Sequence, residues 1–373
     1  MAASNPATRA KWPLRAGVLA GVATSLALTG LVLAPAFSRR TDSEEINIFF
    51  HGFQDSRGVT VLSPTVDLVK DFTDRTSLRA KFGVDAISAS SDSCARCHPD
   101  GVWSQRAVGS VSMSRKYGDT TVGVGGELSQ ENFYRATTLS TTISRAMNGA
   151  NTTIAPGYAF SFNQPVLHPS EFAEKQYAHD LYLSLTQTLT KTTMAQVGVE
   201  FAQVRGYQTS PFLRASVNGL LVPGQSPDLR NRYTFSARIK QALPAATYLE
   251  ADYRRYHDNW QIDSNSLSLG LSHHFGDSLV AYGAFRRYDQ TGAYFYAPSY
   301  SGTPEFFTGD FRLFPFDSKL ITGRIGYTPK DGLMGMKPGT TLSLQYERYS
   351  TSRSFDAAIF TGGLTIPFGR KTP

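Results

Sequence analysis

Apolar and polar residues alternate with a period of two along most of the chain after Glu45. Between residues 78 and 86 the even positions are apolar, and the odd positions are Arg79, Lys81, Gly83 and Asp85. Because successive side chains of a strand point to opposite faces, this pattern predicts a strand with one apolar face and one polar face. The same alternation recurs in segments 232–240, 249–254 and 342–347.

The alternating segments predict an all-β chain of sixteen antiparallel strands. Fourteen is the alternative, because the two segments between residues 136 and 163 are the weakest. An even number returns both ends of the chain to the same side of an up-and-down barrel. The expected strands are 45–54, 59–72, 76–88, 105–117, 121–129, 136–147, 152–163, 179–189, 194–207, 230–242, 247–258, 266–275, 279–290, 319–328, 340–350 and 355–368.

The connections between these segments fall into two classes. Short turns such as 73–75, 118–120 and 276–278 alternate with connections that vary widely in length. Transmembrane barrels of bacteria place short turns in the periplasm and longer loops outside the cell. Residues 39–373 are therefore expected to form a barrel in the bacterial outer membrane, surrounded by its lipid. A soluble β-sandwich does not explain the separation of the two classes. The long extracellular loops are expected near 89–104, 164–178, 208–229 and 291–317.

Composition agrees with a membrane barrel. Aromatic residues make up 12% of the chain and charged residues only 18%, which suits strands with a lipid-facing side and a water-facing side. The last expected strand ends in the aromatic Phe368, a feature that the barrel-assembly machinery requires, although five residues follow it.

Residues 1–38 are expected to be an export signal. Arg9, Lys11 and Arg15 precede an uncharged run, and small residues at 34–36 suit cleavage. The alternative is an uncleaved membrane helix. Three of the seven net positive charges lie in this segment, so the basic balance of the chain is no evidence for a nucleic-acid partner.

The two cysteines of the chain are Cys94 and Cys97, and His98 follows directly. The spacing C-x-x-C-H is that of a covalent haem c site, in which two thioether bonds hold the porphyrin and the histidine binds the iron. A disulfide within the loop is the alternative that oxidising surroundings favour. A zinc site is less favoured, because a fourth ligand is not evident.

A haem at this site requires further partners. Candidate sixth ligands of the iron are His51, His168 and His179, each of which is also compatible with an ordinary rim or lumen residue. The hydrocarbon core is about 30 Å thick, too far for one haem to carry electrons across it. Electron transfer would therefore need a multihaem cytochrome in the periplasm or outside the cell.

Two segments of the chain, Phe50–Thr65 and Ser77–Ser90, carry a family resemblance. Their sequences are FHGFQDSRGVTVLSPT and SLRAKFGVDAISAS. The chain resembles the bacterial outer-membrane proteins of domain-of-unknown-function family three-five-seven-zero, most clearly over residues 46–90 and more diffusely towards the C-terminus. This resemblance implies a barrel and assigns no catalytic residues.

These observations favour a porin-like barrel of an outer-membrane redox system, carrying one haem c on an extracellular loop. A solute channel with a Cys94–Cys97 disulfide and a structural barrel with a closed lumen remain the alternatives. No nucleophile signature stands out, so an enzyme is not expected. The aromatic loop around residues 294–316 is interpreted as packing, with an inward constriction or a docking surface as alternatives. Charges expected in the lumen, and interpreted as pairing across strands, are Arg79, Lys81, Asp85, Glu200, Arg232, Arg238, Glu250, Asp252, Arg254, Arg324 and Glu347.

Overall fold

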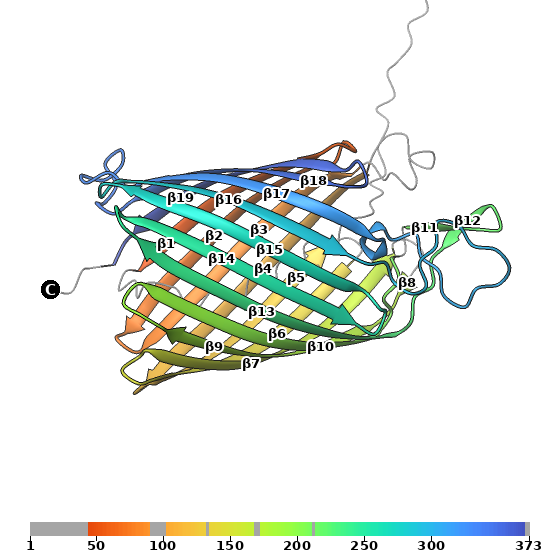
Figure 1. Ribbon diagram of the computed structural model, residues 1–373, viewed down its shortest axis with the longest axis horizontal. Helices are drawn as coiled ribbons and strands as arrows, with labels where there is room; N and C mark the ends of the chain where they lie inside the picture. The colour runs from red at the N-terminus through yellow and green to blue at the C-terminus, as the bar shows by residue number, and fades with distance from the viewer. Residues whose placement is uncertain (1–43, 90–101, 132–133, 168–171, 211–212, 370–373) are drawn as a thin grey trace, which may run out of the picture.

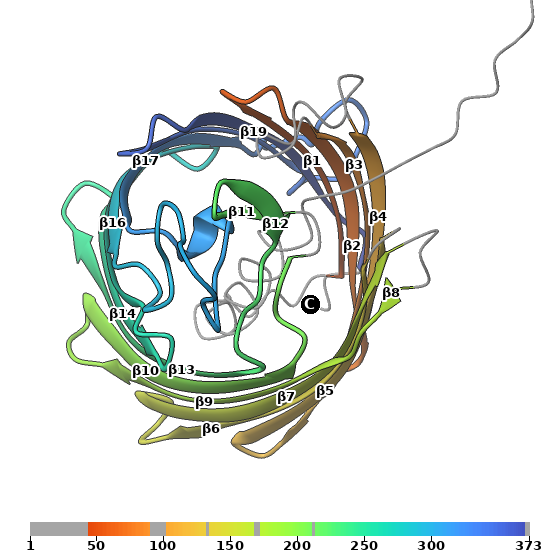
Figure 2. The same ribbon diagram turned by 90° about the vertical axis from the view of Figure 1, so that its right-hand side faces the viewer.

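The chain forms a closed antiparallel barrel, seen from the side in Figure 1 and along its axis in Figure 2. The computed structural model describes residues 44–89, 102–131, 134–167, 172–210 and 213–369. The segment 1–38, expected to be a signal peptide, lies outside the described residues. The barrel strands are β1 (Glu45–Asp55), β2 (Thr60–Thr73), β3 (Thr76–Ala89), β4 (Val102–Tyr117), β5 (Thr120–Glu131), β6 (Tyr134–Met147), β7 (Thr152–Leu167), β9 (Gln176–Thr188), β10 (Thr193–Gly206), β13 (Leu229–Leu243), β14 (Thr247–Asp258), β15 (Asp263–Phe275), β16 (Leu279–Gln290), β17 (Phe316–Tyr327), β18 (Thr341–Thr351) and β19 (Asp356–Pro367).

Each barrel strand pairs with its neighbour along the chain, and the last strand closes on the first. β1 pairs with β2 on one side and with β19 on the other, from Glu45 opposite Pro367 to Asp55 opposite Ala357. Closure leaves no open sheet edge, so the backbone groups are hydrogen-bonded within the wall, as lipid requires. The prediction of sixteen strands is confirmed, and β6 and β7 show that the weakest pair is present.

The outer face of the wall is apolar. Phe82, Leu139 and Leu269 point outwards and keep 57%, 60% and 50% of their surface accessible. Their sequence neighbours point inwards and are mostly polar or small, as the alternation predicts. An apolar exterior around a polar interior is the inverse of a soluble β-protein and fits a lipid environment.

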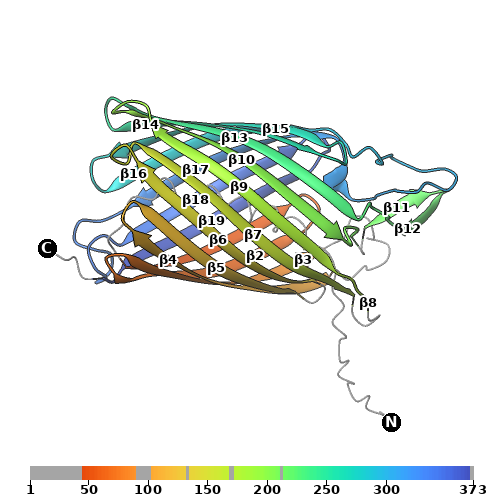
Figure 3. The ribbon, with the colours of Figure 1, turned by 90° about the horizontal axis from the view of Figure 1, so that it is seen from below.

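Tight turns join the strands at one end of the barrel, on the left in Figure 3. Several of these turns use backbone conformations with positive φ, such as Gly118 (φ 59°), Asn148 (φ 53°) and Gly276 (φ 64°). Glycine and asparagine adopt this region at low cost, so the turn residues match the geometry. The one long connection at this end joins β17 to β18.

Two long connections mark the opposite end. Residues 207–228 contain the hairpin β11–β12 (Arg214–Val217 and Leu220–Pro223), and residues 291–315 contain the short 3-10 helix η2 (Phe311–Leu313). The two-residue strand β8 (Phe172–Ala173) pairs antiparallel with the end of β7. Shorter connections such as 259–262 also lie at this end, so loop length varies here as expected. Across the described ranges, the structure contains no helix long and apolar enough to span a membrane.

Candidate functional site at the barrel mouth

Two long loops pair with each other at the mouth of the barrel. We call them the lid (residues 207–210, 213–228 and 291–315). Val217 forms a parallel bridge with Tyr300, and Gln225 forms an antiparallel bridge with Phe307. Asn218 donates from Nδ2 to the carbonyl of Gly302 (2.9 Å) and accepts from its N–H (2.8 Å). Seen along the axis, much of the lid lies inside the outline of the barrel (Figure 2), so it narrows the mouth.

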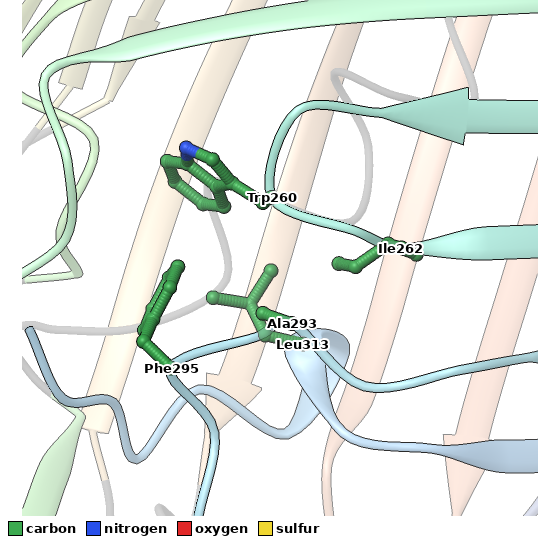
Figure 4. Close-up of a cluster of buried hydrophobic side chains, with 5 residues drawn as sticks. All are labelled: Trp260, Ile262, Ala293, Phe295 and Leu313. Carbon is green, nitrogen blue, oxygen red and sulfur yellow. The ribbon is translucent and has the colours of Figure 1, made fainter.

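The lid rests on a small hydrophobic core that is separate from the wall. Trp260 and Ile262, from the connection between β14 and β15, pack with Ala293, Phe295 and Leu313 of the lid (Figure 4). Trp260 is only 2% exposed, and its ring meets the Phe295 ring edge-on at 5.2 Å between centroids. This packing is what the aromatic sequence of the loop predicted.

A fully buried carboxylate fixes the turn that carries Trp260. Asp258 Oδ2 accepts from the Arg230 guanidinium (2.5 Å) and the Tyr256 hydroxyl (2.7 Å). Its Oδ1 accepts from the backbone N–H groups of Trp260 (2.9 Å) and Ile262 (3.0 Å). The Arg230 guanidinium also lies over the Trp260 ring, 4.3 Å from its centroid. Asp258 therefore ties the core of the lid to the wall strands β13 and β14.

The lid reaches the far rim of the mouth as well. Arg57, in the turn between β1 and β2, lies 5.7 Å from the centroid of Phe311 in η2. Arg353, in the turn between β18 and β19, donates to the carbonyl of Pro315 (2.7 Å) and lies over the Phe314 ring. These contacts of partly or fully exposed arginines are weaker than the packed core on the β14–β15 side.

An acidic cap closes the start of η2. Asp310 accepts from the backbone N–H of Arg312 (3.0 Å) and forms an ion pair with its guanidinium (2.5 Å). Burial lowers the pKa of Arg312, but the adjacent Asp310 carboxylate outweighs it, so the pKa lies above its ordinary value. Arg312 therefore stays charged inside the lid.

One part of the lumen wall is rich in charges that pair across strands. Lys240 on β13 contacts Glu250 on β14 at 2.6 Å, and Arg238 pairs with Asp252. In the part of the lumen wall formed by β2, β3 and β4, Arg79 pairs with Asp67 (2.6 Å) and Arg106 with Asp85 (2.5 Å). The interpretation that lumen charges pair across strands is borne out for these residues.

The wall formed by β6 and β7 is different. Their lumen faces carry hydroxyl, amide and small side chains, and no charged residue lies on these faces in the described part of the two strands. Thr138 and Ser161 hydrogen-bond across the two strands at 2.8 Å. The lumen faces of β6 and β7 are thus polar without charge, in contrast to the charged faces of β2–β4, β13 and β14.

The histidines named as candidate iron ligands do not lie together. β1 continues to Asp55, so His51 lies four residues before its end, on the lumen side, with Nδ1 2.9 Å from Thr361 Oγ1. His179 lies on the outer face of β9, 2.8 Å from the Tyr158 hydroxyl and beside the Phe160 ring. Cys94, Cys97, His98 and His168 lie outside the described residues. Within the described ranges, no group of three or more His, Cys, Asp or Glu side chains is arranged to hold a metal ion.

Sequence reasoning missed the pairing of the two long loops and the role of Asp258 and Trp260. A tryptophan in a four-residue connection between two strands was a signal of limited value, because aromatic residues at the rim of a membrane barrel also form its interfacial girdle. The partner loop could not be identified in the same way, because loop-to-loop pairing leaves no periodic pattern.

Among solved structures, the chain is similar to outer-membrane proteins of Pseudomonas aeruginosa. The siderophore receptor PirA matches with 14% identity and a TM-score of 0.46, over 84% of this chain and 57% of the receptor. OccK1 (OpdK) matches with 8% identity and a TM-score of 0.46, over 87% of this chain and 98% of that protein. The chain thus spans little more than half the length of the siderophore receptors it matches. No curated protein matches it.

A family model matches residues 95–356, from the connection after β3 to the first residue of β19. This range lies beyond residues 46–90, where the resemblance was clearest, and it covers most of the barrel and the whole lid. The apolar outer face and the closed sheet of sixteen strands place the protein in the bacterial outer membrane. It is an outer-membrane β-barrel and belongs to the family described as Protein of unknown function (DUF3570).

Proposed function

We propose that the barrel conducts small polar solutes across the outer membrane and that the lid narrows the outer mouth of the path. The observation that carries this proposal is the position of the lid, whose own core lies over a polar lumen. A sixteen-stranded barrel encloses more space than its inward side chains fill, unlike an eight-stranded one. A constriction at the mouth then selects by size.

The lining of the lumen supports polar rather than strongly ionic cargo. Charges on β13 and β14 are paired at short distances, and pairs of this kind present little net field to a passing ion. The hydroxyl-rich faces of β6 and β7 offer hydrogen bonds in place of charges. Both features suit solutes that exchange hydrogen bonds with water for hydrogen bonds with the wall.

Swelling of proteoliposomes tests this proposal directly. Purified full-length protein is reconstituted, and the vesicles are diluted into isosmotic arabinose, glucose or raffinose. We expect swelling that is fastest for the smallest sugar, because the lid limits the size of the opening. Absence of swelling with every sugar, from protein that migrates as a folded barrel on gels, would instead favour a structural barrel with a closed lumen.

We propose a covalent haem c at Cys94, Cys97 and His98 as a second candidate function, from the C-x-x-C-H motif alone. The strand ends that flank the motif, Ala89 of β3 and Val102 of β4, belong to the same end of the barrel as the lid. A redox role would also need an electron-transfer partner such as a multihaem cytochrome.

The haem proposal has its own test. The protein is expressed in a strain able to mature c-type cytochromes, and a denaturing gel is stained for haem. Stain that stays with the denatured band, and is lost on Cys97→Ser, supports the proposal. A colourless protein without free thiols makes the pair a loop disulfide, and the solute channel is unaffected by that result.

A further inference from the structure

Three adjacent strands place a carboxylate and a guanidinium on the lumen face, with a small residue between them. Asp180 on β9 and Arg232 on β13 both lie directly opposite Ala202 on β10. Neighbouring strands are about 4.8 Å apart, so the Cα atoms of Asp180 and Arg232 are about 10 Å apart. Ala202 fills little of that distance, and the long Arg232 side chain can reach towards the shorter Asp180 above it.

Both ionic groups hold buried atoms without a hydrogen-bond partner. Asp180 Oδ2 and Arg232 Nε are shielded from solvent, and neither finds a donor or acceptor among the described residues. Most buried polar atoms in folded proteins are bonded, and each exception costs on the order of 1–3 kcal/mol. A guanidinium offers five N–H donors in a planar fork, so Arg232 has donor capacity left for an anion that is not part of the wall.

The neighbouring carboxylates do not supply that anion. Asp258 lies opposite Arg232 in the register, but both of its oxygens are taken by Arg230, Tyr256 and the backbone of the Trp260 turn. Glu200 is oriented towards Arg254, at 4.0 Å. Asp180 remains within electrostatic range of Arg232 without a hydrogen bond between them. The pair is therefore separated, and Asp180 Oδ2 and Arg232 Nε are left without a partner among the described residues.

The position of the pair connects it to the lid. Tyr134, at the start of β6, lies near enough to both Arg232 and Arg312 of the lid for their charges to act on it. Arg232 is the fourth residue of β13 and lies opposite Asp258, the last residue of β14, so it lies just inside the mouth. A solute that passes the constriction would meet this pair before the rest of the lumen.

We propose that Arg232 and Asp180 form a binding subsite for zwitterionic solutes of the α-amino acid class. The solute carboxylate accepts from the Arg232 guanidinium, which binds carboxylates through two parallel hydrogen bonds. The solute ammonium donates to Asp180, and the nearby Glu200 adds negative charge on that side. This inference rests on the proposed solute channel and narrows the class of solute that it takes.

Binding is tested separately from transport. Detergent-solubilised full-length protein is titrated with L-alanine, propionate or ethylamine, and saturation-transfer NMR of the small molecule reports binding. We expect saturable binding of alanine, and binding at least about tenfold weaker for propionate and ethylamine, each of which lacks one charged group. Arg232→Gln and Asp180→Asn should each weaken alanine binding by a similar factor.

Two further variants control for charge and for folding. Arg324→Gln removes another lumen arginine, whose guanidinium lies 4.9 Å from the centroid of the Tyr282 ring, and should leave alanine binding unchanged. Arg232→Lys keeps the charge without the planar fork and should bind alanine with intermediate affinity, which tests the site even if Arg232→Gln fails to fold.

The outcomes distinguish the two proposals. Alanine binding that is absent, or equal in the wild type, Arg232→Lys and Asp180→Asn proteins, overturns the subsite. If sugars still swell the vesicles in that case, the solute channel stands without it. If no sugar permeates but alanine binds through Arg232 and Asp180, the subsite is present in a barrel that does not conduct, and the proposed function fails alone.

Discussion

The two ends of this barrel are built by different physical means. At one end, tight turns close the strand pairs with residues such as Gly118 and Gly276, and the described residues there form no hydrophobic core. At the other end, two loops meet over the mouth and bury Trp260, Phe295 and Leu313 as a soluble domain does. The lid is therefore stabilised by side-chain packing, as a small domain is, whereas the wall is stabilised by closure of the sheet.

This division predicts that lid and wall respond independently to mutation. The wall has sixteen hydrogen-bonded strand pairs, and loss of side-chain packing at the mouth leaves these pairs intact. The lid depends on one small cluster, and one truncation there removes much of what holds it. Substitutions at the two places should therefore separate conductance from unfolding.

The largest effect is expected from Trp260→Ala. Truncation of a buried tryptophan costs about 3–5 kcal/mol of folding free energy. We expect this loss to unfold the lid, because its core contains only five buried residues. Trypsin should cleave the lid, which contains Arg214 and Arg312, much faster than in the wild type, while the folded barrel keeps its mobility on unheated gels. Trp260→Phe retains a ring against Phe295 and should remain largely protected. Equal protection of the wild type and Trp260→Ala would show that the core does not hold the lid.

A smaller effect, on the stability of the wall and not of the lid, is expected from Leu269→Arg. This side chain lies in the middle of β15 on the outer face, opposite Ala251 and Phe285. Arginine near the bilayer midplane costs about 2–4 kcal/mol, so unfolding in urea from lipid vesicles should shift to lower urea concentration. Conductance and protease resistance of the lid should stay at wild-type values. Leu269→Ile is the matched control, and a change in lid protection would contradict independence of the two regions.

The smallest effect is expected from Gly118→Ala, at the turn end. The glycine has φ 59°, and a Cβ added to it would meet no other atom. The substitution therefore costs about 1–2 kcal/mol of folding free energy through backbone strain alone. Urea unfolding should shift slightly, and solute permeation should not change. Gly323→Ala, where φ is ordinary and space is also open, should be closer to neutral.

The wall could be predicted from the sequence because its pattern is periodic. The alternation around Phe82 assigned one face to lipid and the other to the lumen, and the number of strands followed from the turn positions. The lid could not be predicted, because the Val217–Tyr300 bridge joins residues that are far apart in the chain. Nothing in the local sequence encodes such a contact.

The candidate site divides along the same line. Pairs such as Arg238 with Asp252 join adjacent strands, and alternation with turn positions was enough to expect pairing across strands. The open pair of Asp180 and Arg232 depends on which carboxylates are already occupied, and only the full hydrogen-bond network gives that information. The haem motif is the reverse case, because it is explicit in the sequence and lies outside the described residues.

The most direct measurement is the single-channel conductance of the wild type and of a variant in which residues 293–313 are replaced by a short Gly-Ser linker. β16 and β17 are paired neighbours, so a short connection can join them. A matched variant shortens the connection at residues 331–336, at the turn end. We expect a small conductance in the wild type and in the matched variant, and a several-fold larger one without the lid segment. Equal conductance in all three, or none in any folded variant, would contradict a channel narrowed by its lid.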